Sequence, residues 1–229
     1  MNLHNIAMVA ADTTRTKFYM NELIKNKLLP NYVLLLLNNN SKLLPGQKDF
    51  NTKNDLICQL KDNGIKYDIA SNSNINSDEA ITSIANRSEQ VFIFSGFGGV
   101  LLKGKILDIG KKFLHIHGGY LPDYKGSTAN YYSLIEQNVI GASAIFLTKE
   151  IDCGPILLRN FFSPPRDRTK IDHISDSKVR AKVLVECLQN YIDSGSWKYE
   201  LESNRGGETF YIIHPVLKHL TILGNSALQ

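Results

Sequence analysis

The sequence predicts an α/β fold: a doubly wound, mostly parallel sheet with a short C-terminal appendage. Short apolar runs alternate with segments of helical length and period, as expected when helices cover both faces of a parallel sheet. The chain has 229 residues and is 43% hydrophobic, which is enough to bury the core of one such domain. We therefore expect a main domain over residues 1–163. Residues 164–229 are expected to add a helix and a strand that do not form an independent domain.

The predicted strands are the short apolar runs that polar or glycine-containing segments bound. They span residues 5–10, 32–37, 66–70, 90–95, 113–117, 142–148 and 156–161. Helical periodicity fills most of the gaps, over residues 14–25, 54–63, 77–86, 99–109, 128–136 and 174–194. A Ser-Pro-Pro sequence at 163–165 ends the alternation, and a strand-like run follows the last helix at 209–213. This tail is too short for a second domain.

Composition and charge exclude several classes of protein. The net charge of +4 comes without a long basic run, so no nucleic-acid partner is demanded, and anionic small ligands are equally suited. Cys58, Cys153 and Cys187 form no C-x-x-C pair, which argues against a disulfide framework or a zinc knuckle. The first residues are typical of a strand rather than a signal peptide, and no apolar run reaches membrane-spanning length. We expect a cytoplasmic protein with no membrane partner, and leave a homodimer open.

The most informative stretch is FLHIHGGYLPDYKGST at residues 113–128. Side chains two apart on a strand share a face, so His115 and His117 are expected to point into one crevice at the carboxyl end of the sheet. Asp152, in KEIDCGPIL at 149–157, lies in a turn between two apolar runs and is expected at the same edge. A carboxylate beside an imidazole favours the charged ring and fixes its orientation. This arrangement is typical of acid/base catalysis.

Other interpretations of these residues stay open. A single histidine at a strand end is more often structural, and Asp before Gly-Pro is usually turn chemistry; their joint placement is what favours function. His115, His117 and Asp152 could instead bind a metal that activates water, as in a hydrolase. The glycines of GFGG at 96–99 give only a weak dinucleotide-type signal, since that fingerprint normally closes the first strand.

Residues 90–161 resemble the folate-dependent formyltransferases. The family shows Asn-x-His at a strand end, then Leu-Pro, Tyr-Arg-Gly or Tyr-Lys-Gly, and further on Asp-x-Gly-Pro-Ile. The matching elements here are His115-x-His117, Leu121-Pro122, Tyr124-Lys125-Gly126 and Asp152-Cys153-Gly154-Pro155-Ile156. SGFGGVL at 95–101 is similar to the family's pterin-binding segment. The resemblance makes residues 1–163 the catalytic domain.

The resemblance implies roles for three residues at the chemical centre. His117 corresponds to the family's acid/base histidine, and Asp152 to the carboxylate that orients it. His115 stands where the family has Asn, whose amide donates to the developing oxyanion, and we expect the histidine to retain that role through an N–H. Gly118 and Gly119 replace the usual Pro-Ser, which lets backbone approach closely.

The resemblance also implies the ligands. The co-substrate is expected to be 10-formyltetrahydrofolate, and no metal is predicted. The positions that match the pterin site are Phe94, Gly99, Val100, Leu101, Thr148, Lys149, Glu150 and Ile151. Residues placed to contact the acceptor substrate are Thr13, Thr14 and Arg15 before the first helix, where an anion could bind, and Lys125.

The expected acceptor is a small-molecule amine, a nucleotide-linked amino sugar destined for surface glycan biosynthesis. Few residues follow 161 and they are not markedly basic, which disfavours tRNA. No regulatory module precedes the first strand, which disfavours a formyltetrahydrofolate hydrolase. GETFYIIHPVL at 207–217 is similar to tails of amino-sugar formyltransferases. Glycinamide ribonucleotide as acceptor, and a non-catalytic binder of folate or nucleotide sugar, remain alternatives.

Overall fold

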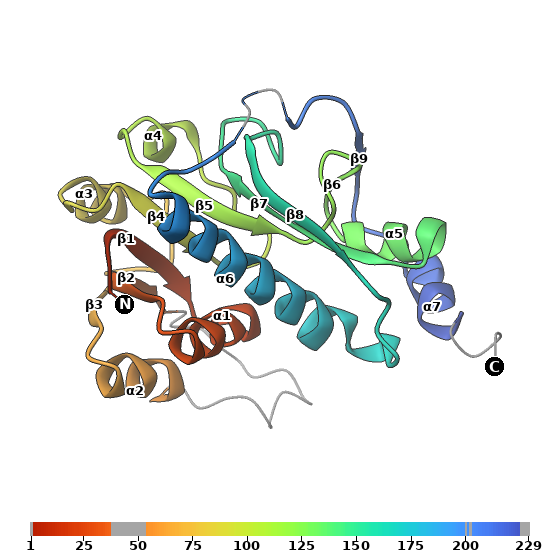
Figure 1. The fold of residues 1–229 in the computed structure, drawn as a ribbon, viewed down its shortest axis with the longest axis horizontal. Helices are drawn as coiled ribbons and strands as arrows, with labels where there is room; N and C mark the ends of the chain where they lie inside the picture. Colours follow the sequence, from red (N-terminus) through yellow and green to blue (C-terminus); the bar gives the residue numbers. More distant parts are fainter. Residues whose placement is uncertain (1, 38–53, 200, 202, 225–229) are drawn as a thin grey trace. The chain divides into compact units, whose positions relative to one another are not determined.

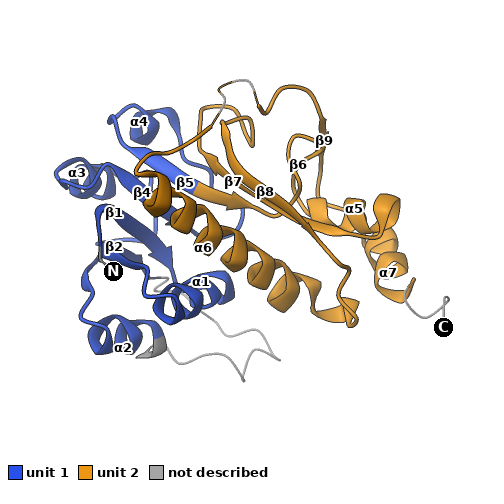
Figure 2. Ribbon diagram, viewed as in Figure 1, with its two compact units in different colours: residues 1–114 blue, residues 115–229 orange. Residues whose placement is uncertain are grey.

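The computed structural model describes residues 2–37, 54–199, 201 and 203–224 (Figure 1). The chain divides into two compact units, residues 1–114 and 115–229 (Figure 2). The boundary falls within strand β5 (Lys112–His117). A division at 163/164, as expected from the sequence, stays a prediction.

The first unit contains a parallel sheet with strand order β3-β2-β1-β4-β5. Its remaining strands are β1 (Asn2–Ala11), β2 (Leu29–Leu36), β3 (Lys66–Ile69) and β4 (Val91–Ser95). Its helices are α1 (Thr14–Lys25), α2 (Asn54–Asp62), α3 (Asp78–Ala85) and α4 (Gly104–Leu107). β1 lies between β2 and β4, and Met8, Val9 and Ile93 are fully buried there. Continuous apolar strands of this kind are expected where both faces of a parallel sheet are covered.

A partly buried ion pair precedes β4 and is hydrogen-bonded to β2. Glu89, which immediately precedes β4, accepts hydrogen bonds from Arg87 and from Asn31 of β2. The Arg87 guanidinium also lies 3.8 Å from the centre of the Tyr32 ring. Burial raises the pKa of Glu89, but the hydrogen bonds from Arg87 and Asn31 outweigh it and lower that pKa to about 2.

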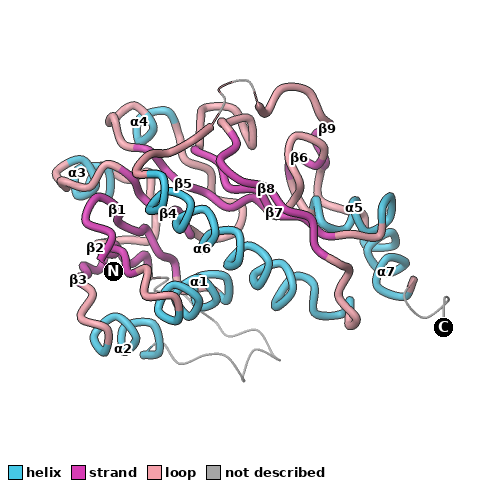
Figure 3. The backbone as a smooth tube through the Cα atoms, viewed as in Figure 1, coloured by secondary structure: helices cyan, strands magenta, loops and turns pink. Residues whose placement is uncertain are grey.

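The second unit combines two pairs of strands with a long helix (Figure 3). Its elements after β5 are β6 (Tyr124–Gly126), α5 (Ala129–Gln137), β7 (Ile140–Phe146), β8 (Ile156–Phe162), α6 (Asp176–Ser194), β9 (Glu208–Phe210) and α7 (Pro215–Leu223). β7 and β8 pair antiparallel, whereas β6 and β9 pair parallel. The buried face of α6 packs on β7 and β8.

Aromatic contacts fix the chain where it leaves α6. Trp197, the single tryptophan of the sequence, stacks on Tyr191 with ring centroids 4.2 Å apart. The Trp197 indole packs edge-on against Phe146 of β7, with ring centroids 5.4 Å apart. The Tyr199 ring also packs edge-on against Phe146, at 5.7 Å. Such pairs add about 0.5 to 1.5 kcal/mol beyond their buried area. The residues after α6 are therefore held against β7.

The predicted α/β fold with a mostly parallel sheet is confirmed, and every predicted strand from 5–10 to 156–161 overlaps an observed one. The helix predicted at 99–109 is reduced to α4. Gly99 has a φ of +76°, and the Asn76 side chain donates to the Leu101 carbonyl and accepts from the Lys103 amide, so residues 99–103 form a loop. β6 and α7 were not predicted. Of the helices in the described ranges, none has the length and apolar character needed to cross a membrane.

Candidate active site

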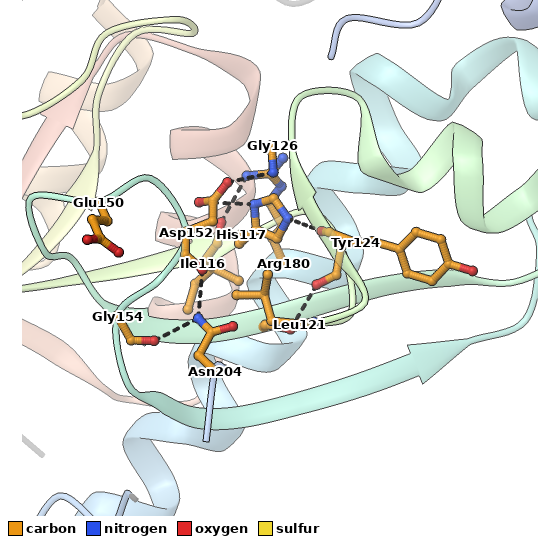
Figure 4. A network of polar contacts seen from close by, with 12 residues as sticks. Ile116, His117, Leu121, Tyr124, Gly126, Glu150, Asp152, Gly154, Arg180 and Asn204 are labelled. Carbon is orange, nitrogen blue, oxygen red and sulfur yellow. Dashed lines mark hydrogen bonds and ion pairs between the residues drawn. The ribbon is translucent and has the colours of Figure 1, made fainter. Parts of the chain in front are cut away.

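His117 is the last residue of β5, and both of its ring nitrogens face protein oxygens (Figure 4). Nε2 lies 2.7 Å from the carbonyl oxygen of Tyr124, and Nδ1 lies 3.4 Å from Oδ1 of Asp152. A carbonyl only accepts hydrogen bonds, so Nε2 carries a hydrogen and donates it. Any proton that the ring exchanges is therefore carried by Nδ1, on the side of Asp152. The residue is 4% exposed.

Asp152 reaches this position through a left-handed backbone conformation. Its φ is +54°, which aspartate tolerates better than most residues. Oδ1 faces His117, while Oδ2 accepts a 2.9 Å hydrogen bond from the backbone amide of Gly126 in β6. The two carboxylate oxygens thus have different partners, which fixes the rotation of the carboxylate about its own axis. The predicted pairing of His117 with Asp152 is present in the structure.

The pKa of His117 is set by opposing influences. Burial lowers it, because a charged ring loses hydration there, and the positive charge of Arg180 lowers it further. The Asp152 carboxylate, the hydrogen bond to Tyr124 and the charge of Asp176 raise it. Burial is the largest influence, so the pKa of His117 lies below its ordinary value. Burial thus favours the neutral form of the ring more than in a free histidine.

The two glycines after His117 are required by close packing. A Cβ on Gly119 would lie 2.7 Å from Nε2 of His117 and 2.5 Å from the Tyr124 carbonyl oxygen. A Cβ on Gly118 would overlap the side chains of Arg180 and Asp176. Gly119 therefore lets the backbone pack closely against the imidazole. Gly118 leaves room for the side chains of Arg180 and Asp176 on α6.

An ion pair on α6 supports the strand end that carries His117. Arg180 donates from Nη1 to the carbonyl of Ile116, at 2.9 Å, and its Nε lies 2.7 Å from Oδ2 of Asp176. Asp176 also accepts from Asn130 of α5, at 2.9 Å. Sequence reasoning missed this pair, because nothing in the local pattern of a helix indicates which distant carbonyl it contacts.

The predicted acceptor-binding residues of the first unit lie at the start of α1. Thr13 caps the helix, its hydroxyl accepting from the Thr16 amide, and Thr14 is the first helical residue. Arg15 donates to the Ser95 hydroxyl, at 3.4 Å, and to the Gly96 carbonyl, directly after β4. The structure thus brings this helix start to the loop that holds predicted pterin-site residues. A substrate contact for these residues stays a prediction.

The predicted pterin-binding residues fall in both units. In the first, Phe94 is buried in β4, while Gly99, Val100 and Leu101 follow in the loop, where Leu101 is 54% exposed. In the second, Thr148, Lys149, Glu150 and Ile151 form an exposed segment that leads into Asp152, with Ile151 also 54% exposed. Their role in binding stays a prediction.

Two further predicted residues have distinct environments. His115 is half-buried on β5, on the same face as His117 by strand alternation, and its role as an oxyanion donor stays a prediction. Lys125 is 6% exposed, and its ammonium donates to the backbone carbonyls of Asn204 and Gly206 at 3.0 and 2.6 Å. A contact of Lys125 with the acceptor stays a prediction. Within the described ranges, no three His, Cys, Asp or Glu side chains gather as a metal site.

Asn204 is the other residue that sequence reasoning missed. Its side-chain amide donates to the carbonyls of Asp152 and Gly154, at 2.6 and 2.8 Å, and the residue is 4% exposed (Figure 4). It lies 52 residues from Asp152 in the chain, so no local pattern pointed to it.

Comparison with known proteins is consistent with this geometry. Residues 4–172 match the family model described as formyl transferase. A methionyl-tRNA formyltransferase from Finegoldia magna is 33% identical over 154 residues, which are 62% of this chain and 47% of that protein. One from Desulfotalea psychrophila is 27% identical over 42% of this chain and 30% of its own length. This chain thus matches less than half the length of either relative.

Solved structures with the same fold include two N-formyltransferases. A sugar N-formyltransferase from a Shewanella species has a TM-score of 0.59 at 14% identity, over 96% of this chain and 87% of that one. An N-formyltransferase from Helicobacter canadensis, in complex with folinic acid and dTDP-3-aminofucose, has the same TM-score of 0.59 at 14% identity, over 91% and 71%. The family match spans most of the sequence and includes both His117 and Asp152, so the chain belongs to the formyl transferase family.

Proposed function

We propose that the chain is an N-formyltransferase that moves a formyl group from 10-formyltetrahydrofolate to the amine of a nucleotide-linked amino sugar. The observation that carries the proposal is the buried pair of His117 and Asp152, whose facing atoms are 3.4 Å apart. Formyl transfer to an amine requires the nitrogen that attacks to lose a proton and the nitrogen that leaves to gain one. A single imidazole between the two nitrogens can manage both transfers.

His117 and Asp152 have separate parts in this scheme. His117 accepts or donates the proton at Nδ1, since Nε2 is committed to the Tyr124 carbonyl. Asp152 stabilises the imidazolium that forms transiently, and its bond from the Gly126 amide keeps the carboxylate aimed at Nδ1. A positioned acid/base group contributes about 100-fold to 10,000-fold in rate. His115, on the same strand face, would donate to the oxyanion that develops on the formyl oxygen.

The residues available for the folate fit its chemistry. The pterin carries ring nitrogens and an amino group that backbone amides and carbonyls can satisfy, and the segments at 99–101 and 148–151 would supply such groups. Leu101 and Ile151 each leave about half of their surface exposed. The reduced folate supplies the formyl group when bound. The residues of this chain supply orientation and the proton.

The acceptor assignment is supported by the structural relatives. The Shewanella protein is a sugar N-formyltransferase, and this chain spans 87% of it, whereas it spans 47% of the Finegoldia methionyl-tRNA formyltransferase. The sequence relatives make methionyl-tRNA the second candidate acceptor. A nucleotide-linked amino sugar and methionyl-tRNA are very different in size. An assay that identifies the formylated product therefore distinguishes them.

The test is an acceptor panel. Purified protein is incubated with 10-formyltetrahydrofolate and, in separate reactions, dTDP-linked amino sugars, glycinamide ribonucleotide and charged methionyl-tRNA, with His117→Asn as the matched control. Mass spectrometry should find an amino sugar heavier by one formyl group, formed by the wild type and not by the variant. Transfer to methionyl-tRNA or glycinamide ribonucleotide alone would replace the sugar assignment, and absence of transfer to every acceptor would refute the enzyme assignment.

A further inference from the structure

The segment at residues 203–210 lies outside the part of the chain that matches the family, yet it contacts the turn that carries Asp152. The Asn204 side chain donates both of its amide hydrogens there, to the carbonyls of Asp152 and Gly154. The hydroxyl of Ser203 accepts from the amide of Ile156, at 3.1 Å, where β8 begins. Three hydrogen bonds thus join this segment to residues 152–156.

The same segment is bound to β6, which supplies the other partner of Asp152. The Lys125 ammonium donates to the carbonyls of Asn204 and Gly206. β9 pairs with β6 in parallel register, with Tyr124 opposite Glu208 and Gly126 opposite Phe210. Gly207, at a φ of +77°, packs directly on the Pro122 carbonyl, where a Cβ would overlap it. The position of the segment is therefore fixed from both sides.

These contacts form a closed ring around the carboxylate. The side chain of Asp152 accepts a hydrogen bond from the Gly126 amide. Lys125, which precedes Gly126, donates to the Asn204 carbonyl. The Asn204 side-chain amide in turn donates to the Asp152 carbonyl. We propose that Asn204 is a positioning residue of the active site, which holds the Asp152 turn so that the carboxylate faces Nδ1 of His117. The proposal rests on the proposed function for its kinetic test.

The physical reason is the conformation of the turn. Asp152 has a positive φ, which an L-residue adopts at some cost unless surrounding contacts compensate. The buried Asn204 amide provides that compensation because it satisfies two carbonyls of the turn at once. Without the amide, those carbonyls lose their partners and the turn is no longer held in one conformation. The carboxylate would then leave Nδ1, although neither His117 nor Asp152 had been altered.

The kinetic test uses Asn204→Ala, with Asn204→Ser as a second variant that keeps one donor on a shorter side chain. We expect kcat to fall by up to about 100-fold in Asn204→Ala, the effect of a misplacement near 1 Å, with the KM for acceptor and folate little changed. Asn204→Ser should recover part of that loss. The matched control is Glu208→Gln, whose exposed side chain lies in the same segment and should leave kcat unchanged. Thermal melts of all four proteins establish that each is folded.

A double-mutant cycle with Asp152→Asn shows whether Asn204 acts through Asp152. If it does, Asn204→Ala costs little further activity once the carboxylate is gone. An equal fold loss in both backgrounds would overturn the proposal, and so would wild-type kcat in Asn204→Ala.

A readout without turnover separates this inference from the proposed function. NMR titration of His117 in isotope-labelled protein should find its pKa lowered in Asp152→Asn, because the carboxylate raises it, and lowered by a smaller amount in Asn204→Ala. If the wild type transfers no formyl group, the proposed function fails, and the titration alone decides the positioning role. An unchanged His117 pKa in Asn204→Ala would overturn that role.

Discussion

The Nδ1 atom of His117 lies 3.4 Å from Oδ1 of Asp152, and Nε2 of the same ring lies 2.7 Å from the Tyr124 carbonyl. Because Nε2 donates its hydrogen to the Tyr124 carbonyl, Nδ1 is the ring nitrogen that can exchange a proton. The separation of 3.4 Å is longer than a strong charge-assisted hydrogen bond. Protonation of the ring is expected to shorten it, since attraction between the two groups requires the imidazolium.

Substitution of either member of this pair should abolish most of the transfer activity. His117→Asn removes the proton carrier and is expected to lower kcat by about 100-fold to 10,000-fold. Asp152→Asn keeps the shape and the bond from Gly126 but removes the charge, so it should also lower kcat. Steady-state assays with saturating folate and acceptor measure kcat for both variants. Near wild-type kcat in His117→Asn would contradict the assigned role.

The pH dependence of stability should reveal the lowered pKa of His117. In the unfolded chain the pKa of His117 is about 6.5, whereas burial lowers this pKa in the folded protein. The unfolded state therefore binds more protons below that pH, and the free energy of unfolding falls as the pH decreases from about 6.5 toward the lowered pKa. Urea denaturation at about pH 7.5 and about pH 5.5 should find this loss smaller in His117→Asn. An equal loss in both proteins would exclude the histidine as its source.

Gly119→Ala should displace the imidazole. The added Cβ would lie 2.7 Å from Nε2 and 2.5 Å from the carbonyl that orients the ring, so something must move. We expect a loss of about 1 to 3 kcal/mol in the free energy of unfolding, together with reduced kcat. Gly104→Ala is the control, because its Cβ would meet only Asp108 Oδ2, at 3.8 Å. Equal behaviour of the two variants would show that the close contact is not constraining.

Glu89→Gln tests the ion pair in the first unit. The pKa of Glu89 is lowered to about 2, so the ionised carboxylate contributes stability above its unfolded pKa that is lost as the pH falls toward about 2. At neutral pH the variant is expected to lose about 1.5 to 3 kcal/mol, the contribution of a hydrogen bond to a charged group. Denaturation of both proteins between about pH 3 and pH 7 checks this. The difference between the proteins should shrink as the pH decreases.

His115→Asn tests whether the histidine replaces the family's amide donor. If both side chains donate to the oxyanion, the variant should retain kcat within about tenfold, since loss of such a donor costs about 100-fold to 1,000-fold. His115→Ala should show that larger loss. Abolished turnover in His115→Asn would show that the imidazole does something an amide cannot.

Sequence reasoning predicted the pairing of His117 with Asp152 because its signals are local. His117 ends an apolar strand and Asp152 lies in a Gly-Pro turn, so each could be placed at the carboxyl edge of a sheet from a few neighbouring residues. Asn204 could not be found this way, because its role depends on contacts with residues 52 positions away. Lys125 was expected to contact the acceptor, and that role stays a prediction. Its bonds to the carbonyls of Asn204 and Gly206 could not be predicted, because the pairing of β6 with β9 joins distant residues and strands of three residues give no periodic signal.

Trp197, the single tryptophan of the sequence, is an intrinsic fluorescence probe. It is sandwiched between Tyr191 and the edge of Phe146, immediately before the stretch that reaches Asn204. If Trp197 and the residues after it detached from β7, the indole would lose its contact with Phe146 and become exposed to water. Its fluorescence emission would then shift to longer wavelength. Because the sequence contains no second tryptophan, fluorescence can follow the docking of the residues after α6 without any attached dye.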